Sequence, residues 1–380
     1  MKSNLLFKTI FRVLLVLLLS CCILALSSCL NDIPQSRPND EKLEYSINAD
    51  GNTCTVTGLG TYSSKYLIIP ENIDGYTVTA IAEYAFQRTN IETFSGADTI
   101  TTIGKYAFQN CKQLQTVVIP NTVTEIGEHC FEYCENLHSI NLPSNLKNIK
   151  TFTFAECKSI EIMFLPEGIV EIGDAAFYAC EYMTSVNIPN TVETIGKGAF
   201  LGCYYLQDIV IPNGVTTIGA AAFSVCLSLT NIHFPASVVN VGEAVISSNS
   251  LTSIDVDGNN PILSSVDGHL YSNNNTVFIS YACAKPDTSF VIPEGVKKIL
   301  KMSFATCINL QIISIPKSVY YIGSQIFFTS PNIETIYYDG TVDDWKMILK
   351  APDWNEETKS TFIIICTDGT IAMDGTVTYN

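Results

Sequence analysis

The chain is poor in charged side chains and in the residue types that catalysis uses most. Only 15% of its 380 residues are charged, and it has four histidines and two tryptophans. The histidines, His129, His138, His233 and His269, are scattered, and there is no G-x-S-x-G motif, no P-loop and no dinucleotide-binding glycine pattern. We therefore expect no enzyme activity and no cofactor.

Positive charge is also scarce. The sequence has 21 basic against 37 acidic side chains, a net charge of −16. A surface of this sign repels nucleic acid, heparin-like polyanions and anionic lipid head groups, so we expect no nucleic-acid partner. It either keeps an apolar-rich chain soluble, which we favour, or attracts basic partners.

A hydrophobic run long enough to cross a bilayer is missing as well. The longest, Val13–Leu26, has 14 residues and follows three basic residues, Lys2, Lys8 and Arg12. It ends in Leu26-Ser27-Ser28-Cys29, which resembles the lipobox of bacterial lipoproteins. That resemblance implies a signal peptide at 1–28, acylation of Cys29, and a protein lipid-anchored in the bacterial cell envelope, at the outer membrane or cell surface. The alternative is an ordinary signal peptide that leaves Cys29 a free thiol.

Residues 29–42 are polar and contain Pro34 and Pro38, which predicts an extended spacer between the anchor and the folded domain. Removal of residues 1–28 takes away three basic and no acidic side chains. The remaining chain has 18 basic and 37 acidic residues, a net charge of −19.

What the sequence does contain is a repeat of 23 residues. Phenylalanine, cysteine and proline each recur at this interval: Phe108, Phe131, Phe154, Phe177, Phe200 and Phe223; Cys111, Cys134, Cys157, Cys180, Cys203 and Cys226; Pro120, Pro143, Pro166, Pro189, Pro212 and Pro235. A period of this length is typical of stacked units that cannot bury their apolar faces alone.

Each unit has the rhythm of a leucine-rich repeat. Leu114, Val117 and Ile119 match the L-x-x-L-x-L strand, and Pro120 ends that strand because it has no N–H for a ladder. The return leg is predicted to be a turn and a short helical segment that carries four more apolar side chains inward: Val123, Ile126, Phe131 and Cys134.

The string I-x-I-P-x-x-V-x-x-I-G-x-x-A-F-x-x-C-x-x-L resembles the BspA-like leucine-rich repeats of bacterial surface proteins. The resemblance covers residues 66–338, interrupted by an insert at about 259–283, with an N-terminal hairpin cap at 43–65 and a C-terminal cap at 339–380. It implies a β-rich α/β repeat solenoid, a stack of 23-residue coils with one short parallel strand each. It also implies adhesion and protein binding, with no shared catalytic residues.

The cysteines in the 23-residue ladder are expected to be free thiols. In-register residues on adjacent coils have Cβ atoms about 4.8 Å apart with parallel vectors, whereas a relaxed disulfide prefers about 3.8 Å. Small buried thiols can instead bond neighbouring carbonyls. The pairing of Cys54, Cys283, Cys307 and Cys366 stays open.

Two groups of residues suggest chemistry but are better explained by structure. His129, Cys130, Cys134 and His138 resemble a zinc set, but the repeat puts both cysteines into the core, so we expect no metal. Asp343 and Asp344 suggest a carboxylate pair for sugar cleavage. We interpret them as the first turn of a capping helix with Thr341 as N-cap.

Binding is expected to use the outer, concave side of the strand ladder, because side chains alternate along a strand. The outward column reads Val118, Asn141, Phe164, Asn187, Val210 and His233, then Asp255 after a one-residue shift. Ile162 lies beside Phe164, which makes this coil the most apolar point of the column. Phe164 is either an anchor for a partner or one of the isolated apolar residues normal on any surface.

Two further features have two explanations each. The insert, with a hairpin around Asn273-Asn274-Asn275, is either a ligand-touching loop or a staple between two stacks. A glycine marks most coils, as at Gly104, Gly127 and Gly196, but Lys150 and Leu300 replace it in two. Those two coils are distorted, or the position requires no positive φ.

We therefore expect a cell-surface lipoprotein whose solenoid binds extracellular or surface proteins, including host matrix or another cell. The alternative is an envelope scaffold or carbohydrate-binding module without a host ligand.

Overall fold

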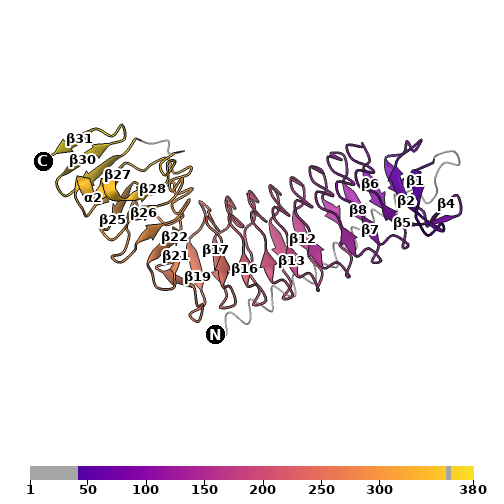
Figure 1. The fold of residues 1–380 in the computed structure, drawn as a ribbon, viewed down its shortest axis with the longest axis horizontal. Helices are drawn as coiled ribbons and strands as arrows, with labels where there is room; N and C mark the ends of the chain where they lie inside the picture. Colours follow the sequence, from indigo (N-terminus) through magenta and orange to yellow (C-terminus); the bar gives the residue numbers. More distant parts are fainter. Residues whose placement is uncertain (1–41, 357–360) are drawn as a thin grey trace.

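The structure is a computed structural model that describes residues 42–356 and 361–380. It is a β-solenoid in which every coil lies against the next (Figure 1). The predicted signal peptide, Cys29 and nearly all of the spacer lie outside the described residues. Two sets of parallel strands lie along the stack, one on each side of the coil, and each set is divided into several hydrogen-bonded sheets; we call each set a ladder.

The first ladder, which we call the long-strand ladder, contains the predicted strands. Adjacent coils pair in parallel at the repeat interval, as Thr116 does with Ser139 and Ile162 with Ser185. Its strands are β3 (Tyr66–Ile68), β6 (Thr93–Ser95), β8 (Thr116–Val118), β10 (Ser139–Ile140), β12 (Ile162–Phe164), β14 (Ser185–Asn187), β17 (Asn231–Phe234), β19 (Ser253–Val256), β23 (Ser289–Val291), β25 (Ile312–Ile315), β27 (Thr335–Tyr338) and β29 (Ile363–Cys366).

The predicted short helical segment of the return leg is wrong: in the described coils this leg consists of turns and a second ladder, because its backbone pairs with the preceding coil instead of with itself. Most coils contribute a two-residue strand just before the position where most coils have a glycine, and the second residue of this strand is nearly always a buried isoleucine. This short-strand ladder comprises β5 (Tyr76–Ile81), β7 (Thr102–Ile103), β9 (Glu125–Ile126), β11 (Asn148–Ile149), β13 (Glu171–Ile172), β15 (Thr194–Ile195), β16 (Thr217–Ile218), β18 (Asn240–Val241), β24 (Lys298–Ile299), β26 (Tyr321–Ile322) and β28 (Leu349–Lys350).

Phenylalanine rings stack through the interior. From Phe108 to Phe223 successive rings are 5.3–5.6 Å apart at interplanar angles of 1–12°, and every ring is fully buried. This offset stacking is the geometry that aromatic pairs prefer, and the coil spacing imposes it. The predicted solenoid of 23-residue coils is confirmed.

The ladder cysteines are free and buried, as predicted. Each Sγ donates to the phenylalanine carbonyl of the preceding coil at 3.0–3.2 Å, as Cys134 does to Phe108. Each of these carbonyls also accepts from the backbone N–H three residues later, as Phe108 does from Cys111, so the thiol is a second donor that links adjacent coils. Cys283 and Cys307, whose pairing the sequence left open, form a disulfide across two adjacent coils.

The repeated glycines have ordinary φ angles, and close packing between coils explains them. A Cβ built on Gly196 would lie 2.5 Å from the carbonyl carbon of Gly173, and one on Gly173 would lie 2.8 Å from the nitrogen of Thr151. Positive φ occurs instead two and six residues later, mostly at residues other than glycine, such as His129 and Tyr133. The second explanation of this position is the correct one.

The insert divides the interior into two cores. Strands β20 (Leu263–Val266), β21 (His269–Ser272) and β22 (Val277–Ser280) pair antiparallel, and β22 then pairs in parallel with β24. Leu270 and Ile279 pack into the N-terminal core, whereas Tyr271 and Phe278 pack into the C-terminal core. In Figure 1 the stack bends near β19 and β22.

Both ends of the stack are covered. At the N-terminal end β1 (Glu44–Ile47) pairs antiparallel with β2 (Thr53–Gly58), which pairs in parallel with β5; β4 (Asn72–Ile73) pairs with β5 too. At the other end lie α2 (Val342–Met347), β30 (Gly369–Ala372) and β31 (Val377–Tyr379). The predicted capping box of α2 is confirmed: the Thr341 hydroxyl accepts from the Asp344 N–H, and the Asp344 carboxylate accepts from the Thr341 N–H.

Candidate functional site

The outward side of the long-strand ladder, which we call the ladder face, holds the predicted column. Inward neighbours such as Val117, Met163 and Val186 are buried. The column residues between them reach the surface to different degrees: Val210 is 68% exposed, His233 is exposed, and Val118, Asn141, Ile162, Phe164 and Asn187 are partly buried. The alternation predicted from the sequence therefore holds on this face.

The two asparagines of the column are occupied within the chain. The Asn141 side-chain amide donates to the Ile119 carbonyl at 2.7 Å, and its oxygen accepts from the Ile119 N–H at 2.9 Å. Asn187 makes the same pair of bonds with Leu165. Both amides extend the ladder onto the preceding coil, so their main role is to hold adjacent strands together.

Phe164 and Ile162 lie side by side on β12, and Phe164 is in register with Asn187 on β14. Both are partly buried, which leaves part of each side chain accessible. Two coils further on, Val210 is the most exposed apolar side chain of the predicted column. These three residues form the apolar part of the column.

At the next coils the ladder face becomes polar. His233 Nδ1 lies 2.7 Å from Asp255 Oδ2 on the neighbouring strand, and both side chains are more than half exposed. Exposed ion pairs of this kind contribute little to stability. This pair separates the apolar part of the column from the C-terminal strands.

The C-terminal strands carry exposed apolar residues that lie beyond Asp255, where the column predicted from the sequence ends. Val291 on β23 is 66% exposed, Tyr337 on β27 is 42% exposed and Ile363 on β29 is 44% exposed. These strands belong to one sheet, in which β23 pairs with β25, β25 with β27, and β27 with β29. The same rule of alternation, continued past the insert, would have found them. The ladder face therefore has two apolar regions, one around Phe164 and Val210 and one on β23, β27 and β29.

The turn edge of the coils presents aromatic rings that sequence reasoning also missed. Tyr84, Tyr106, His129 and Phe152 stack in line at 4.7–4.9 Å, all in the left-handed conformation. Five exposed tyrosines lie further along this edge, and two of them, Tyr182 and Tyr205, stack at 5.4 Å. The five are Tyr133, Tyr178, Tyr182, Tyr204 and Tyr205. The available signal was spacing: these five tyrosines lie one or two residues from a ladder cysteine, and Tyr106, His129 and Phe152 lie five residues before one.

The residues that resemble a zinc set point in different directions. Cys130 and Cys134 are fully buried, whereas the His129 ring lies in the aromatic stack and its Nδ1 is 2.9 Å from Glu132. Within residues 42–356 and 361–380, no three histidine, cysteine or acidic side chains are grouped to hold a metal ion.

The insert behaves as a staple. His269 is buried, stacks on Tyr281 at 4.2 Å, and its Nδ1 accepts from the Ala282 N–H. Burial, with the nearby Lys285 ammonium, lowers the pKa of His269 to about 3, so the imidazole is neutral at physiological pH. These contacts fix the hairpin between the two cores.

In the part of the chain that the structure describes, no helix has the length and apolarity to cross a membrane.

Comparison with known proteins identifies the repeats. The profile of the BspA type leucine-rich repeat region matches residues 79–207, 170–283 and 280–347. A leucine-rich cell surface protein of Faecalibacterium prausnitzii has a similar structure, with a TM-score of 0.60 and 23% identity over 84% of this chain and 98% of that one. A leucine-rich repeat protein of Bacteroides ovatus gives a TM-score of 0.49 at 24% identity over 80% and 71%. No curated protein matches.

Proposed function

Because the chain belongs to the family of BspA type leucine-rich repeat proteins, we propose that it is a bacterial surface protein whose ladder face binds other proteins. One observation carries this proposal: apolar side chains stand exposed on the ladder face, on β12 and on the coil between β14 and β17, led by Val210 at 68%. A rigid surface loses little conformational entropy when it binds, and exposed apolar groups on it provide anchors for a partner.

We propose further that Cys29 carries a lipid anchor and that the partners are extracellular proteins, including host matrix or proteins of another cell. The Faecalibacterium prausnitzii relative is described as a cell surface protein, which supports the location. The net charge of −19 that remains after removal of residues 1–28 suits partners with basic surfaces and disfavours nucleic acid. The solenoid acts by binding, and we assign it no catalytic role.

The test is a binding panel of extracellular-matrix proteins, plasma proteins and glycans against the domain from Asn31 onward. Phe164→Glu is expected to weaken capture of the partner at least about tenfold, because a charge is placed in the apolar part of the column. Thermal unfolding should stay unchanged since Phe164 is only partly buried. Loss of folding would place Phe164 in the core and remove it from the site.

A carbohydrate-binding module is the second candidate, and the exposed tyrosines of the turn edge favour it. Aromatic rings with one apolar face and one polar group are suited to sugars as well as proteins. Glycan capture that survives Phe164→Glu and is lost on Tyr182→Ala would support this candidate. If no protein or glycan of the panel binds, an envelope scaffold is favoured.

A further inference from the structure

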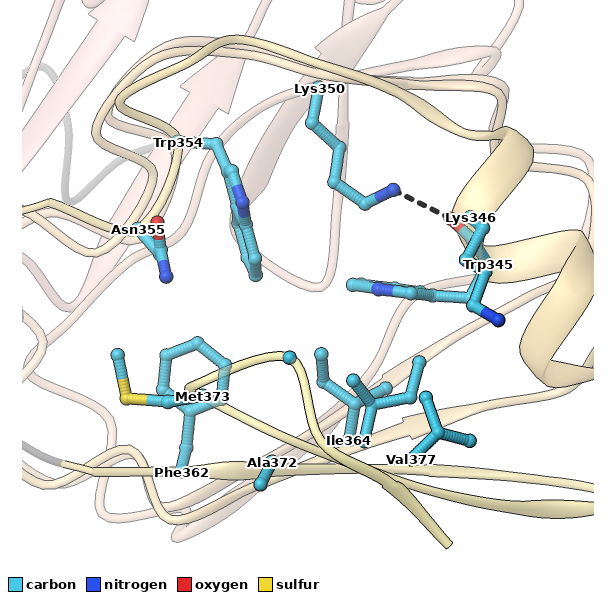
Figure 2. Close-up of a pocket in the computed structure, with 12 residues that line it drawn as sticks. Trp345, Lys346, Lys350, Trp354, Asn355, Phe362, Ile364, Ala372, Met373 and Val377 are labelled. Atoms are coloured by element: carbon cyan, nitrogen blue, oxygen red, sulfur yellow. Dashed lines mark hydrogen bonds between the residues drawn. The ribbon is translucent and has the colours of Figure 1, made fainter. Parts of the chain in front are cut away.

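The C-terminal cap encloses a cleft of about 330 Å³, far from the apolar part of the predicted column (Figure 2). Its walls come from α2, β28, the turn at Trp354, and strands β29, β30 and β31. This volume lies at the lower end of the range for small-molecule sites, so it accommodates a ligand with about one ring.

Both tryptophans of the chain line this cleft. The rings of Trp345 and Trp354 are 5.9 Å apart at 68°, and Phe362 meets Trp354 at 5.9 Å and 66°. Trp345 and Phe362 are buried in the C-terminal core, whereas Trp354 is partly exposed and Met373 is 41% exposed. Figure 2 shows the two indoles and Lys350 across the cleft from Phe362, Ile364 and Met373. The cleft is therefore aromatic at its back and open at its mouth.

Lys350 supplies the charge of the cleft. Its Nζ lies 4.8 Å from the ring centroid of Trp345 and donates to the carbonyls of Trp345 and Ile348 at 2.6 and 3.0 Å. An ammonium has three N–H groups, so one remains. Burial lowers the pKa of Lys350 to about 8, and across residues 42–356 and 361–380 no carboxylate acts against that effect.

The other charged side chain of the lining differs in this respect. Lys346 lies 3.5 Å from Asp343 Oδ1 and already has a counter-ion. No acidic residue lines the described part of the cleft, although the chain has 37 acidic residues against 21 basic ones. A partly buried cation without a counter-ion is costly, and an anionic ligand group would remove that cost.

We propose that this cleft binds a small aromatic carboxylate, whose ring packs against Trp345, Trp354 and Phe362 and whose carboxylate pairs with Lys350. The aromatic cage alone would also suit a quaternary ammonium, but Lys350 repels a cation. A sugar would need several hydrogen-bonding side chains, whereas most of this lining is apolar. The charge and the rings together select the aromatic acid.

The ligand arms of the test use the unaltered full chain and the fluorescence of its two tryptophans, both of which report on the cleft. We expect saturable change with 3-phenylpropionate, and binding at least about tenfold weaker for 3-phenylpropanamide, which has the same ring without the charge. The peptide Gly-Gly-Phe carries the same group at its end. Tighter binding of the peptide would identify a chain terminus as the source, and weaker binding a free acid. Equal binding of acid and amide, stronger binding of phenethylamine, or no saturable change would overturn the proposal.

The variant arm isolates Lys350. Lys350→Met should weaken 3-phenylpropionate at least about tenfold and leave the amide within about twofold, whereas Lys350→Arg should retain most of the binding. Lys298→Met is the matched control, because Lys298 also lies over an aromatic ring, 5.8 Å from Tyr320, on a strand outside the cleft. If both lysine-to-methionine variants bind the acid like the unaltered chain, the proposal is wrong. If Lys350→Met fails to fold, the acid and amide comparison decides alone.

Discussion

At the scale of the residue, close packing between coils restricts the size of side chains at repeated positions. The repeated glycines illustrate this, because backbone atoms of the preceding coil lie where their Cβ would be. We predict that Gly196→Ala lowers the free energy of unfolding by about 2 kcal/mol or more, since backbone atoms cannot yield as a flexible side chain can. Gly258→Ala is the control, because nothing lies within 4 Å of its Cβ and its φ is not positive. Urea unfolding of both variants measures the difference; equal stability would contradict the packing explanation.

The ladder thiols make stability depend on pH in the alkaline range. Burial raises the pKa of Cys226 from its usual value of 9.0 to about 12. The unfolded chain therefore releases this proton above pH 9 while the folded chain keeps it. The stabilisation is fully present below pH 9 and is lost as the pH rises towards 12, at about 1.4 kcal/mol per pH unit for each thiol.

We predict that Cys226→Ala reduces the slope with which the unfolding free energy falls between pH 9 and 11. The reduction should equal the contribution of one proton, about 1.4 kcal/mol per pH unit. The measurement is denaturant unfolding of both proteins at several pH values. Tyrosines also titrate in this range, but their contribution is the same in both proteins and cancels in the difference. A slope that does not change would mean that this thiol is accessible to solvent.

At the scale of the element, the hairpin β21–β22 separates two cores that are each packed continuously. Phe278 is fully buried and meets Tyr271 and Phe304 at 5.1 and 4.9 Å, all on the C-terminal side. Stacked coils interact mainly with their neighbours, so such a junction can divide the unfolding transition.

We predict that Phe278→Ala destabilises the C-terminal stack by about 3–5 kcal/mol. Both tryptophans belong to that stack, so the midpoint of unfolding measured by their fluorescence should fall. Phe154→Ala removes an equally buried ring from the N-terminal core and should leave this midpoint nearly unchanged. Equal shifts in both variants would show that the solenoid unfolds as one unit.

Elements differ in how far the sequence predicts them. The long strands follow from Leu114, Val117, Ile119 and the proline after them, because alternation and a missing N–H are local properties. The second ladder could not be foreseen, since a two-residue strand such as Glu125–Ile126 has too few residues for a period. It forms because the coil before it presents a backbone in register.

At the scale of the whole molecule, the sequence predicts the stack but only part of its surface. The outward column was found as far as Asp255, where a one-residue shift and the insert broke the count. The roles of Asn141 and Asn187 depend on the backbone of the preceding coil, which no single repeat shows. The cleft at Trp345 and Trp354 was missed because residues from six elements of the cap line it.

Two exposed valines distinguish the ladder face, the proposed binding surface, from the opposite side of the coils. Val210 lies on that face and is 68% exposed, whereas Val239 is 42% exposed directly before β18 of the short-strand ladder. The measurement is the affinity of Val210→Glu and Val239→Glu for a protein captured by the unaltered domain. We predict a loss of at least about tenfold for Val210→Glu and less than about twofold for Val239→Glu. Equal affinities of the two variants would contradict the account.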